Sequence, residues 1–99
     1  MVLDEQQELM VRTRIKELAD KRDYPKTICP SEVARGLSKQ ELGQLDVSEW
    51  RESMDAVRQT VWKMRNEGVV EVLQKGEVLD AGMRLEDVRG PIRVRAVRS

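Results

Sequence analysis

The feature that most constrains the fold of this chain is an apolar stripe between residues 45 and 69. Five large side chains recur in it at spacings of four, three, four and three residues: Trp50, Met54, Val57, Val61 and Met64. An α-helix places residues with this spacing on one face. We therefore predict a central helix over residues 46–67, against which the rest of the chain packs.

Both ends of the predicted central helix carry the signals of a helix boundary. Asp46 suits the N-cap, and Glu49, three residues later, is positioned to bond back to its amide as in a capping box. Gly68 fits the left-handed position that follows a last turn, and a contact between Val69 and Met64 accompanies a Schellman motif. The helix is thus expected to begin at Asp46 and to end just before Gly68.

The segments before the central helix are predicted to form two further helices. Residues 1–22 have the pattern of an amphipathic N-terminal helix, and its apolar side is formed by Leu3, Met10, Val11, Ile15 and Leu18. Pro30 suits the first position of a helix, so residues 30–43 are predicted to form a second helix followed by a short helical turn. Between the two, residues 26–28 are suited to a small edge strand.

The period of the apolar residues changes from about 3.6 to 2 after Gly68, which predicts β-structure over residues 69–97. A strand that begins at Val70 is followed by a tight turn in which Gly76 takes a positive φ, and this gives a hairpin. Residues 80–90 are polar and predict a loop. In a last strand, one face carries Ile92, Val94 and Ala96 and the other carries Arg93 and Arg95.

This order of elements is typical of a winged helix-turn-helix. We predict an α+β fold in which three helices are followed by a small antiparallel β-sheet, the wing, within a single domain over residues 1–99. The alternative is a three-helix bundle with a loosely attached β-tail. A chain of 99 residues is long enough for one such domain with a modest core.

Composition argues against several functional classes. The 18 basic residues balance 18 acidic ones, so the net charge of zero gives no overall attraction to nucleic acid or to an anionic membrane. Apolar runs are far shorter than the roughly 20 residues of a membrane span. The chain has no histidine, the commonest general base and metal ligand. We therefore expect a soluble, cytoplasmic protein without catalytic activity, cofactor, metal or membrane partner.

Two sequence blocks carry a family resemblance: TICPSEVAR at residues 27–35 and RGPIRVR at residues 89–95. Between them, in order, lie Trp50-Arg51, Met54, Val57-Arg58, Glu67-Gly68 and Gln74-Lys75-Gly76. With these motifs the chain resembles, from about residue 9 to residue 95, a small bacterial family called domain of unknown function 3253. The resemblance implies a winged-helix-like domain. It implies no activity, because the family is uncharacterised.

Arginines on the central helix are candidates for contacts to DNA. In helix-turn-helix proteins the second helix of the pair enters the major groove. Arg51, Arg58 and Arg65 follow one flank of the predicted helix, where guanidinium groups can reach phosphates or a guanine edge. Asp55 is spaced to pair with Arg51 and with Arg58 on the helix surface, and this is the alternative role of those arginines.

The C-terminal end is the most basic part of the sequence. Between positions 89 and 98 there is no acidic residue and there are four arginines: Arg89, Arg93, Arg95 and Arg98. Such a strand can lie along a phosphate backbone, with Lys75 at the hairpin tip adding a further charge. A solvated strand face, whose charges prevent edge-to-edge association, explains the same residues equally well.

Two functions are compatible with these patterns. The preferred one is a small module that contacts double-stranded DNA through Arg51, Arg58, Arg65, Lys75, Arg93 and Arg95. The alternative is a winged-helix protein-interaction or homodimerisation module without nucleic-acid binding, whose patch is Trp62 with the flank of the central helix. Trp62 is exposed on the predicted helix unless another segment covers it. The clustered C-terminal arginines favour the first function, and the neutral net charge favours the second.

Overall fold

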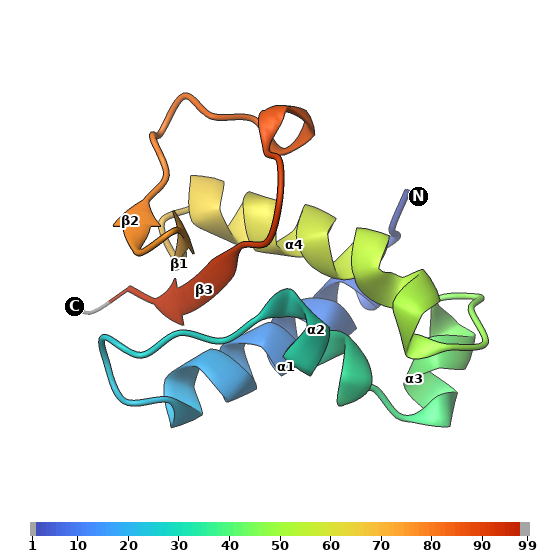
Figure 1. Cartoon of the computed structure of the whole chain (residues 1–99). Helices are drawn as coiled ribbons and strands as arrows, with labels where there is room; N and C mark the ends of the chain where they lie inside the picture. The colour runs from blue at the N-terminus through green and yellow to red at the C-terminus, as the bar shows by residue number, and fades with distance from the viewer. Residues whose placement is uncertain (1, 98–99) are drawn as a thin grey trace.

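The computed structural model describes residues 2–97 and has an α+β fold (Figure 1). In these residues four α-helices precede a three-stranded antiparallel sheet. The elements are α1 (Glu5–Lys21), α2 (Pro30–Arg35), α3 (Lys39–Gln44), the 3₁₀ helix η1 (Trp50–Ser53), α4 (Met54–Asn66), β1 (Val70–Gln74), β2 (Glu77–Val78), the 3₁₀ helix η2 (Leu85–Asp87) and β3 (Arg93–Ala96). The predicted class, helices followed by a small antiparallel sheet, is confirmed, but residues 30–44 form two α-helices, so four helices precede the sheet within residues 2–97 instead of three.

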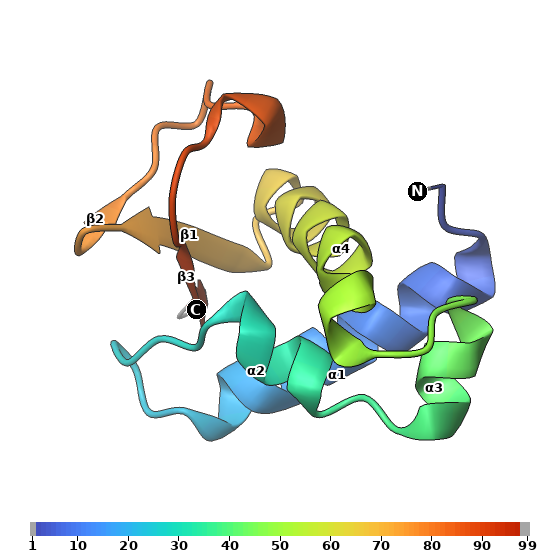
Figure 2. The same cartoon turned by 45° about the vertical axis from the view of Figure 1, so that its right-hand side comes forward.

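Helix α1 packs along α4 (Figures 1 and 2). Its first turn is capped by Asp4, whose carboxylate accepts from the Gln7 amide at 2.8 Å while the Gln7 side chain accepts from the Asp4 amide at 2.9 Å. The helix therefore begins at Glu5, later than predicted; Met1 lies outside the described residues. No helix within residues 2–97 has both the length and the apolarity needed to cross a membrane.

The central helix begins later than the sequence predicted, because Asp46 ends helix α3 and does not cap α4. Asp46 has a φ of 58°. Its amide donates to the Gly43 carbonyl at 3.0 Å, and the Val47 amide donates to the Leu42 carbonyl at 3.1 Å, which are the two hydrogen bonds of a Schellman motif. Aspartate tolerates the left-handed conformation that this position requires. The predicted helix thus consists of a linker, the turn η1, and α4, which begins at Met54.

The end of α4 follows the prediction. Gly68 has a φ of 79°, a conformation that glycine adopts without a Cβ clash. The Val69 amide donates to the Met64 carbonyl at 2.9 Å, and the Gly68 amide donates to the Arg65 carbonyl at 3.0 Å. Strand β1 begins immediately afterwards at Val70, so this Schellman motif sets the direction in which the sheet leaves the helix.

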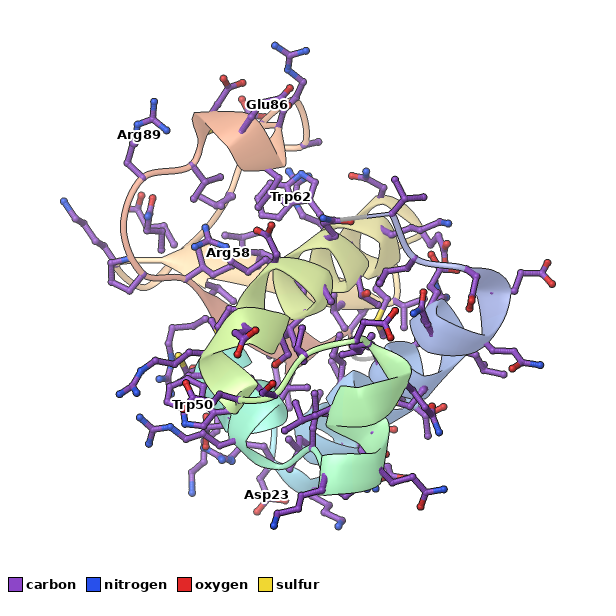
Figure 3. The ribbon with its side chains drawn as sticks, turned by 90° about the vertical axis from the view of Figure 1, so that its right-hand side faces the viewer. Asp23, Trp50, Arg58, Trp62, Glu86 and Arg89 are labelled. Atoms are coloured by element: carbon purple, nitrogen blue, oxygen red, sulfur yellow. The ribbon has the colours of Figure 1, made fainter. Side chains whose placement is uncertain are left out.

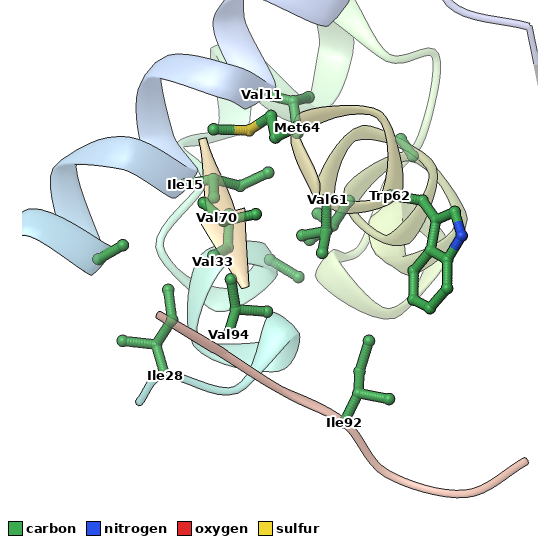
Figure 4. Close-up of a cluster of buried hydrophobic side chains, with 14 of the residues drawn as sticks. Val11, Ile15, Ile28, Val33, Val61, Trp62, Met64, Val70, Ile92 and Val94 are labelled. Carbon is green, nitrogen blue, oxygen red and sulfur yellow. The ribbon is translucent and has the colours of Figure 1, made fainter. Parts of the chain in front are cut away.

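The apolar stripe of the central helix forms the middle of the core, as predicted. Val57, Val61 and Met64 are at most 1% exposed, and Trp50 and Met54 pack against the cluster while remaining partly exposed. Figure 4 shows side chains of the other elements meeting those of α4; they include Val11, Ile15, Val33, Val70 and Val94. Burial of these aliphatic side chains is the main source of stability.

The sheet has the strand order β2-β1-β3, and both pairs are antiparallel. Lys75 (φ 53°) and Gly76 (φ 82°) form the two-residue hairpin turn. On β3 the predicted alternation is present, since Val94 is buried and Arg93 is exposed. The small strand predicted before the second helix is reduced to one bridge, in which Ile28 and Val94 exchange backbone hydrogen bonds of 2.7 and 2.8 Å.

The connection between β2 and β3, residues 79–92, packs on the helices; we call it the strap. It contains η2, which lies against α4 (Figure 2). Val88 of the strap is 7% exposed, and Met83 and Leu85 pack against the core cluster. Residues 80–90 of the strap were predicted to be a polar loop, and the few apolar residues of the strap suffice to fold it back. It therefore covers part of the α4 surface.

Candidate nucleic-acid interface

Arg65, one of the predicted DNA contacts, holds the strap in place. Its Nη1 donates to the Met83 carbonyl at 3.2 Å, and its Nη2 donates to the Asp80 carbonyl. Its guanidinium carbon lies 4.6 Å from the centre of the Trp62 ring. Because its N–H groups bind backbone carbonyls and its guanidinium lies beside an aromatic ring, Arg65 is engaged by the protein itself, although it stays partly exposed. This engagement counts against its predicted role as a DNA contact.

Trp62, the predicted protein-interaction residue, is buried. Its exposed fraction is 7%, and Figure 3 shows its ring beside the turn of the strap that carries Glu86. Met83 and Leu85 line a hollow together with this ring. The prediction of an exposed ring was wrong because the strap supplies apolar side chains that cover this part of α4, which the sequence pattern of the helix alone does not reveal.

The two predicted arginines of β3 have different partners. Arg95 forms an ion pair of 2.8 Å with Glu71 on the neighbouring strand, and its guanidinium carbon lies 4.9 Å from the centre of the Tyr24 ring. Arg93 is exposed and donates to the hydroxyl and to the carbonyl of Thr27, at 2.9 and 3.2 Å. The charge of Arg95 is therefore neutralised by a carboxylate, whereas Arg93 is exposed and forms no ion pair within residues 2–97, although its charge helps to lower the pKa of Glu32.

The wing contributes two further exposed cations. Lys75 lies in the hairpin turn, as predicted, and is exposed. Arg89 is exposed on the strap and donates to the Glu86 carbonyl at 3.3 Å. Arg98, the last arginine of the predicted basic end, lies outside the described residues. The basic C-terminal end thus offers Arg93 and Arg89 to a ligand, with Lys75 added by the hairpin.

A cluster of cations that the sequence did not predict surrounds Trp50. The guanidinium carbon of Arg35 lies 4.6 Å from the centre of the Trp50 ring, and that of Arg51 lies 4.9 Å from it. Arg35 ends α2 and Arg51 belongs to η1, so the two side chains meet because α2 packs on η1. No sequence spacing indicates this contact, since Arg35 precedes Trp50 by 15 residues and the intervening chain contains α3.

A hollow of about 280 Å³ lies at this cluster, between α2, α3 and η1; we call it the Trp50 hollow. Three cations line it, namely Arg35, Lys39 and Arg51, together with the carboxylate of Glu49 and the Trp50 ring. Positive charge therefore outnumbers negative charge in the lining by three groups to one. A concave surface with this excess favours an anionic ligand.

Arg58 extends the unpaired positive charge along α4. It is partly exposed, and Figure 3 shows it on the same side of the molecule as Trp50. Within residues 2–97 neither Arg58 nor Arg35 nor Arg51 forms an ion pair, so the predicted pairs with Asp55 are absent from the structure. We call these three arginines the α2–α4 flank.

Many basic side chains elsewhere in the described part are matched by carboxylates. Arg12 pairs with Glu67 at 2.5 Å and Arg14 pairs with Glu41 at 2.8 Å. The hydrogen bond from Arg12 holds the pKa of Glu67 below its usual value. Burial acts to raise the pKa of Glu41, but hydrogen bonds from Arg14 and from the Ser38 amide outweigh it and lower the pKa. The α2–α4 flank is thus a local positive excess in a neutral protein.

The chemistry available at this flank is that of binding. Its groups are guanidinium, ammonium and indole, which bind anions and stack on planar groups. In residues 2–97 no set of three or more cysteine, aspartate and glutamate side chains is placed to hold a metal ion.

Comparison with known proteins identifies a family. A search of curated proteins finds no match to the chain. A family model described as "Protein of unknown function (DUF3253)" matches residues 8–97, a range that contains most of α1 and every later element. This is the family that the blocks at residues 27–35 and 89–95 resemble. The chain therefore belongs to the DUF3253 family.

Proposed function

We propose that the protein is a winged-helix-like module that binds double-stranded DNA. The order of its elements and the packing of α2 against α4 support this proposal. In a helix-turn-helix, the first helix of the pair crosses the DNA backbone and the second presents its N-terminal residues to the groove. Here α2 takes the first role and η1 with α4 takes the second, while the β1–β2 hairpin serves as the wing.

The observation that carries the proposal is the α2–α4 flank. Arg35, Arg51 and Arg58 come from the two parts of the chain that a helix-turn-helix uses, and they form no ion pair within residues 2–97. Neighbouring like charges that are not ion-paired repel one another. The phosphates of a duplex neutralise them and release counterions, which is the main sequence-independent source of affinity.

The proposed contact zone is narrower than the sequence predicted. The strap engages Arg65 and covers Trp62, so we assign the contacts to η1 and the first turns of α4. Arg95 is not part of the zone because Glu71 neutralises it. Arg93 and Lys75 remain, and they contact the DNA backbone beside the wing.

Three acidic side chains limit the affinity: Glu49, which lines the Trp50 hollow, and two side chains on η1 and α4. Glu52 on η1 and Asp55 on α4 are both exposed near the proposed contact zone. Carboxylates repel phosphates, although within a groove they accept hydrogen bonds from the amino group of cytosine. We therefore expect a modest affinity that phosphate contacts dominate and that salt strongly weakens.

Fluorescence anisotropy of a labelled duplex across a salt series tests the proposal. Three or four phosphate contacts predict an affinity that falls on the order of 100-fold between about 50 and 200 mM salt. Replacing Arg51 and Arg58 together with alanine should lower the salt slope by about two. The matched control is Lys21→Ala, which removes an exposed cation from the last turn of α1 and should leave the slope unchanged. A wild-type protein that fails to bind at about 50 mM salt contradicts the proposal.

The alternative function, a protein-interaction module with Trp62 and the helix flank as its patch, has less support because the Trp62 ring is 7% exposed. Light scattering distinguishes the two functions. A protein that binds no duplex but forms a stable dimer would favour the alternative, and the interface would then have to lie elsewhere than at Trp62.

A further inference from the structure

We propose that the Trp50 hollow is a phosphate-binding subsite and that Trp50 is a positioning residue, which holds Arg35 and Arg51 ready for phosphates of a nucleic-acid backbone. This inference rests on the proposed function and adds to it a defined site and a role for an aromatic residue. The residue is assigned to positioning because it acts through the two arginines that lie over its ring.

Both arginines beside the Trp50 ring have hydrogen-bond donors that the protein does not use. The guanidinium carbons of Arg35 and Arg51 lie 4.6 and 4.9 Å from the centre of the ring, within cation–π distance. A cation–π contact gives the five N–H donors of a guanidinium no hydrogen-bond acceptor. Within residues 2–97 these two side chains donate to no protein acceptor and pair with no carboxylate, so their donors are available to a ligand.

The Trp50 ring is itself held firmly. It packs against the core cluster from the start of η1. The buried Ser53 hydroxyl donates to the Trp50 carbonyl at 2.6 Å, which fixes the backbone of this turn. A ring fixed in this way restricts the rotamers of both arginines before a ligand arrives. Less conformational entropy is then lost on binding, and affinity rises without any additional contact.

The chemistry of the lining selects a phosphate. A guanidinium presents a planar fork that matches two oxygens of a phosphate group, and Lys39 adds a third cation at the same hollow. The volume of about 280 Å³ is below the range of about 300–1,000 Å³ in which small-molecule ligands are enclosed. The hollow therefore suits one or two phosphate groups of a longer chain better than an enclosed nucleotide.

The carboxylate in the lining of the Trp50 hollow provides a test of phosphate binding there. Glu49 is the only carboxylate among the residues that line the hollow; it is exposed, and its side chain makes no cap hydrogen bond to η1. Glu49→Gln removes this repulsion without removing a structural contact, and we expect duplex affinity to rise about threefold at 100 mM salt. The opposite change, Arg35→Ala, removes one phosphate contact and should lower affinity about eightfold at the same salt concentration.

The role of Trp50 is tested by variants that keep every charge. Trp50→Leu keeps both arginines but removes their support, and we expect duplex affinity to fall about fivefold while the salt slope stays near its wild-type value. Trp50→Phe keeps an aromatic face and should restore affinity to within about twofold of wild type. Circular dichroism melts of both variants establish that they are folded. Unchanged affinity in a folded Trp50→Leu variant overturns the positioning role.

The subsite is tested separately from DNA binding with a small probe. In a Trp62→Phe variant, Trp50 is the only tryptophan, so its fluorescence reports on the hollow. We expect titration with inorganic tripolyphosphate to change this emission saturably, and Arg35→Ala in the same background to abolish the change. The control Lys21→Ala should leave it intact.

The outcomes separate the two proposals. Tripolyphosphate binding without duplex binding would support the subsite and overturn the DNA-binding function. Duplex binding that is unaffected by Arg35→Ala and by Glu49→Gln would support the function and overturn the subsite. Failure of both ligands to change the emission or the anisotropy overturns both.

Discussion

The two tryptophans of this protein make the same kind of contact and support different roles. Arg65 lies 4.6 Å from the centre of the Trp62 ring, and Arg35 lies 4.6 Å from the centre of the Trp50 ring. The N–H groups of Arg65 are bound by carbonyls of the strap, whereas those of Arg35 have no acceptor within residues 2–97. A cation over an aromatic ring does not by itself indicate a structural or a binding role. The partners of its N–H edge decide between them.

The two tryptophans also differ in how deeply they are buried. Trp62 is 7% exposed beneath the strap, while Trp50 stands at the edge of the core and is partly exposed. The Trp62 region closes the fold over α4, and the Trp50 region leaves donors at the surface. We therefore expect substitutions around Trp62 to change stability and substitutions around Trp50 to change binding.

The largest expected effect is on stability at Trp62. Trp62→Ala removes a buried ring and should lower the free energy of unfolding by about 3–5 kcal/mol. Trp50→Ala removes a partly exposed ring and should cost less than half as much. Urea denaturation of both variants measures the difference. Equal losses would mean that the two rings contribute equally to the fold, which contradicts the comparison.

The next effect concerns the strap. Arg65→Met keeps an unbranched side chain beside Trp62 but loses two charge-assisted hydrogen bonds to backbone carbonyls, and we expect a loss of about 2 kcal/mol. Amide hydrogen exchange in residues 79–92 should accelerate more than exchange in α1. Arg35→Met, the matched change at Trp50, should alter stability by less than about 0.5 kcal/mol. If amide exchange in the strap is unaltered in the Arg65→Met variant, Arg65 does not hold the strap in place.

A smaller effect shows whether the arginines beside Trp50 bind through their planar guanidinium groups or through their positive charge alone. Arg51→Lys keeps the positive charge but loses the planar fork and its stacking on the ring, so we expect duplex affinity to fall about threefold with an unchanged salt slope. Arg65→Lys serves as the comparison and should leave affinity unaltered, because Arg65 faces the strap. Binding by Arg51→Lys at wild-type strength would show that charge alone is sufficient there.

The smallest effect is the response to acid. The pKa of Glu41 is lowered in the folded protein, so its contribution to stability is complete above its ordinary value of 4.5 and is lost as pH falls through the lowered folded value. The pair with Arg14 is partly exposed and screened by solvent, so we expect its contribution to stability to be small. Glu41→Gln retains a side-chain acceptor for the capping box. In this variant the free energy of unfolding should depend less on pH below about pH 4.5. A steeper curve in this variant would contradict the assignment.

The ion-paired arginines and the arginines beside Trp50 should also respond differently to low pH. Protonation removes the partners of Arg12 and Arg14, whereas Arg35 and Arg51 have no carboxylate partner within residues 2–97 to lose. At a pH low enough to protonate Glu67 and Glu41, the contacts of Arg35 and Arg51 with the Trp50 ring should therefore persist while those two ion pairs are lost.

Local patterns account for the parts of the fold that were predicted correctly. The stripe that contains Val57 and Val61 is buried, and the stop at Gly68 is present, because periodicity and a positive φ depend only on nearby residues. Asp46 was assigned wrongly because a residue that suits an N-cap also tolerates the left-handed end of the preceding helix. Sequence alone did not decide between these two roles.

The candidate site was harder to predict because tertiary contacts define it. Trp62 is buried because the strap folds back across α4. The hydrogen bond from Arg65 to the strap joins residues that are 18 positions apart in the sequence. Arg35 was not predicted because its contact with Trp50 depends on the angle at which α2 meets η1. Arg95 was predicted as a DNA contact because strand alternation predicts which face of the sheet a side chain occupies. It does not predict the ion pair that Arg95 forms with Glu71 on the neighbouring strand.

The most direct test of the central claim is an NMR titration that follows the Nε–Hε resonances of the arginines while a short DNA duplex is added. We expect the resonances of Arg35 and Arg51 to shift progressively with duplex concentration and the resonance of Arg65, which binds the strap, to stay in place. A shift of Arg65 with Arg35 and Arg51 unmoved, or no shift in any of the three, would contradict the central claim.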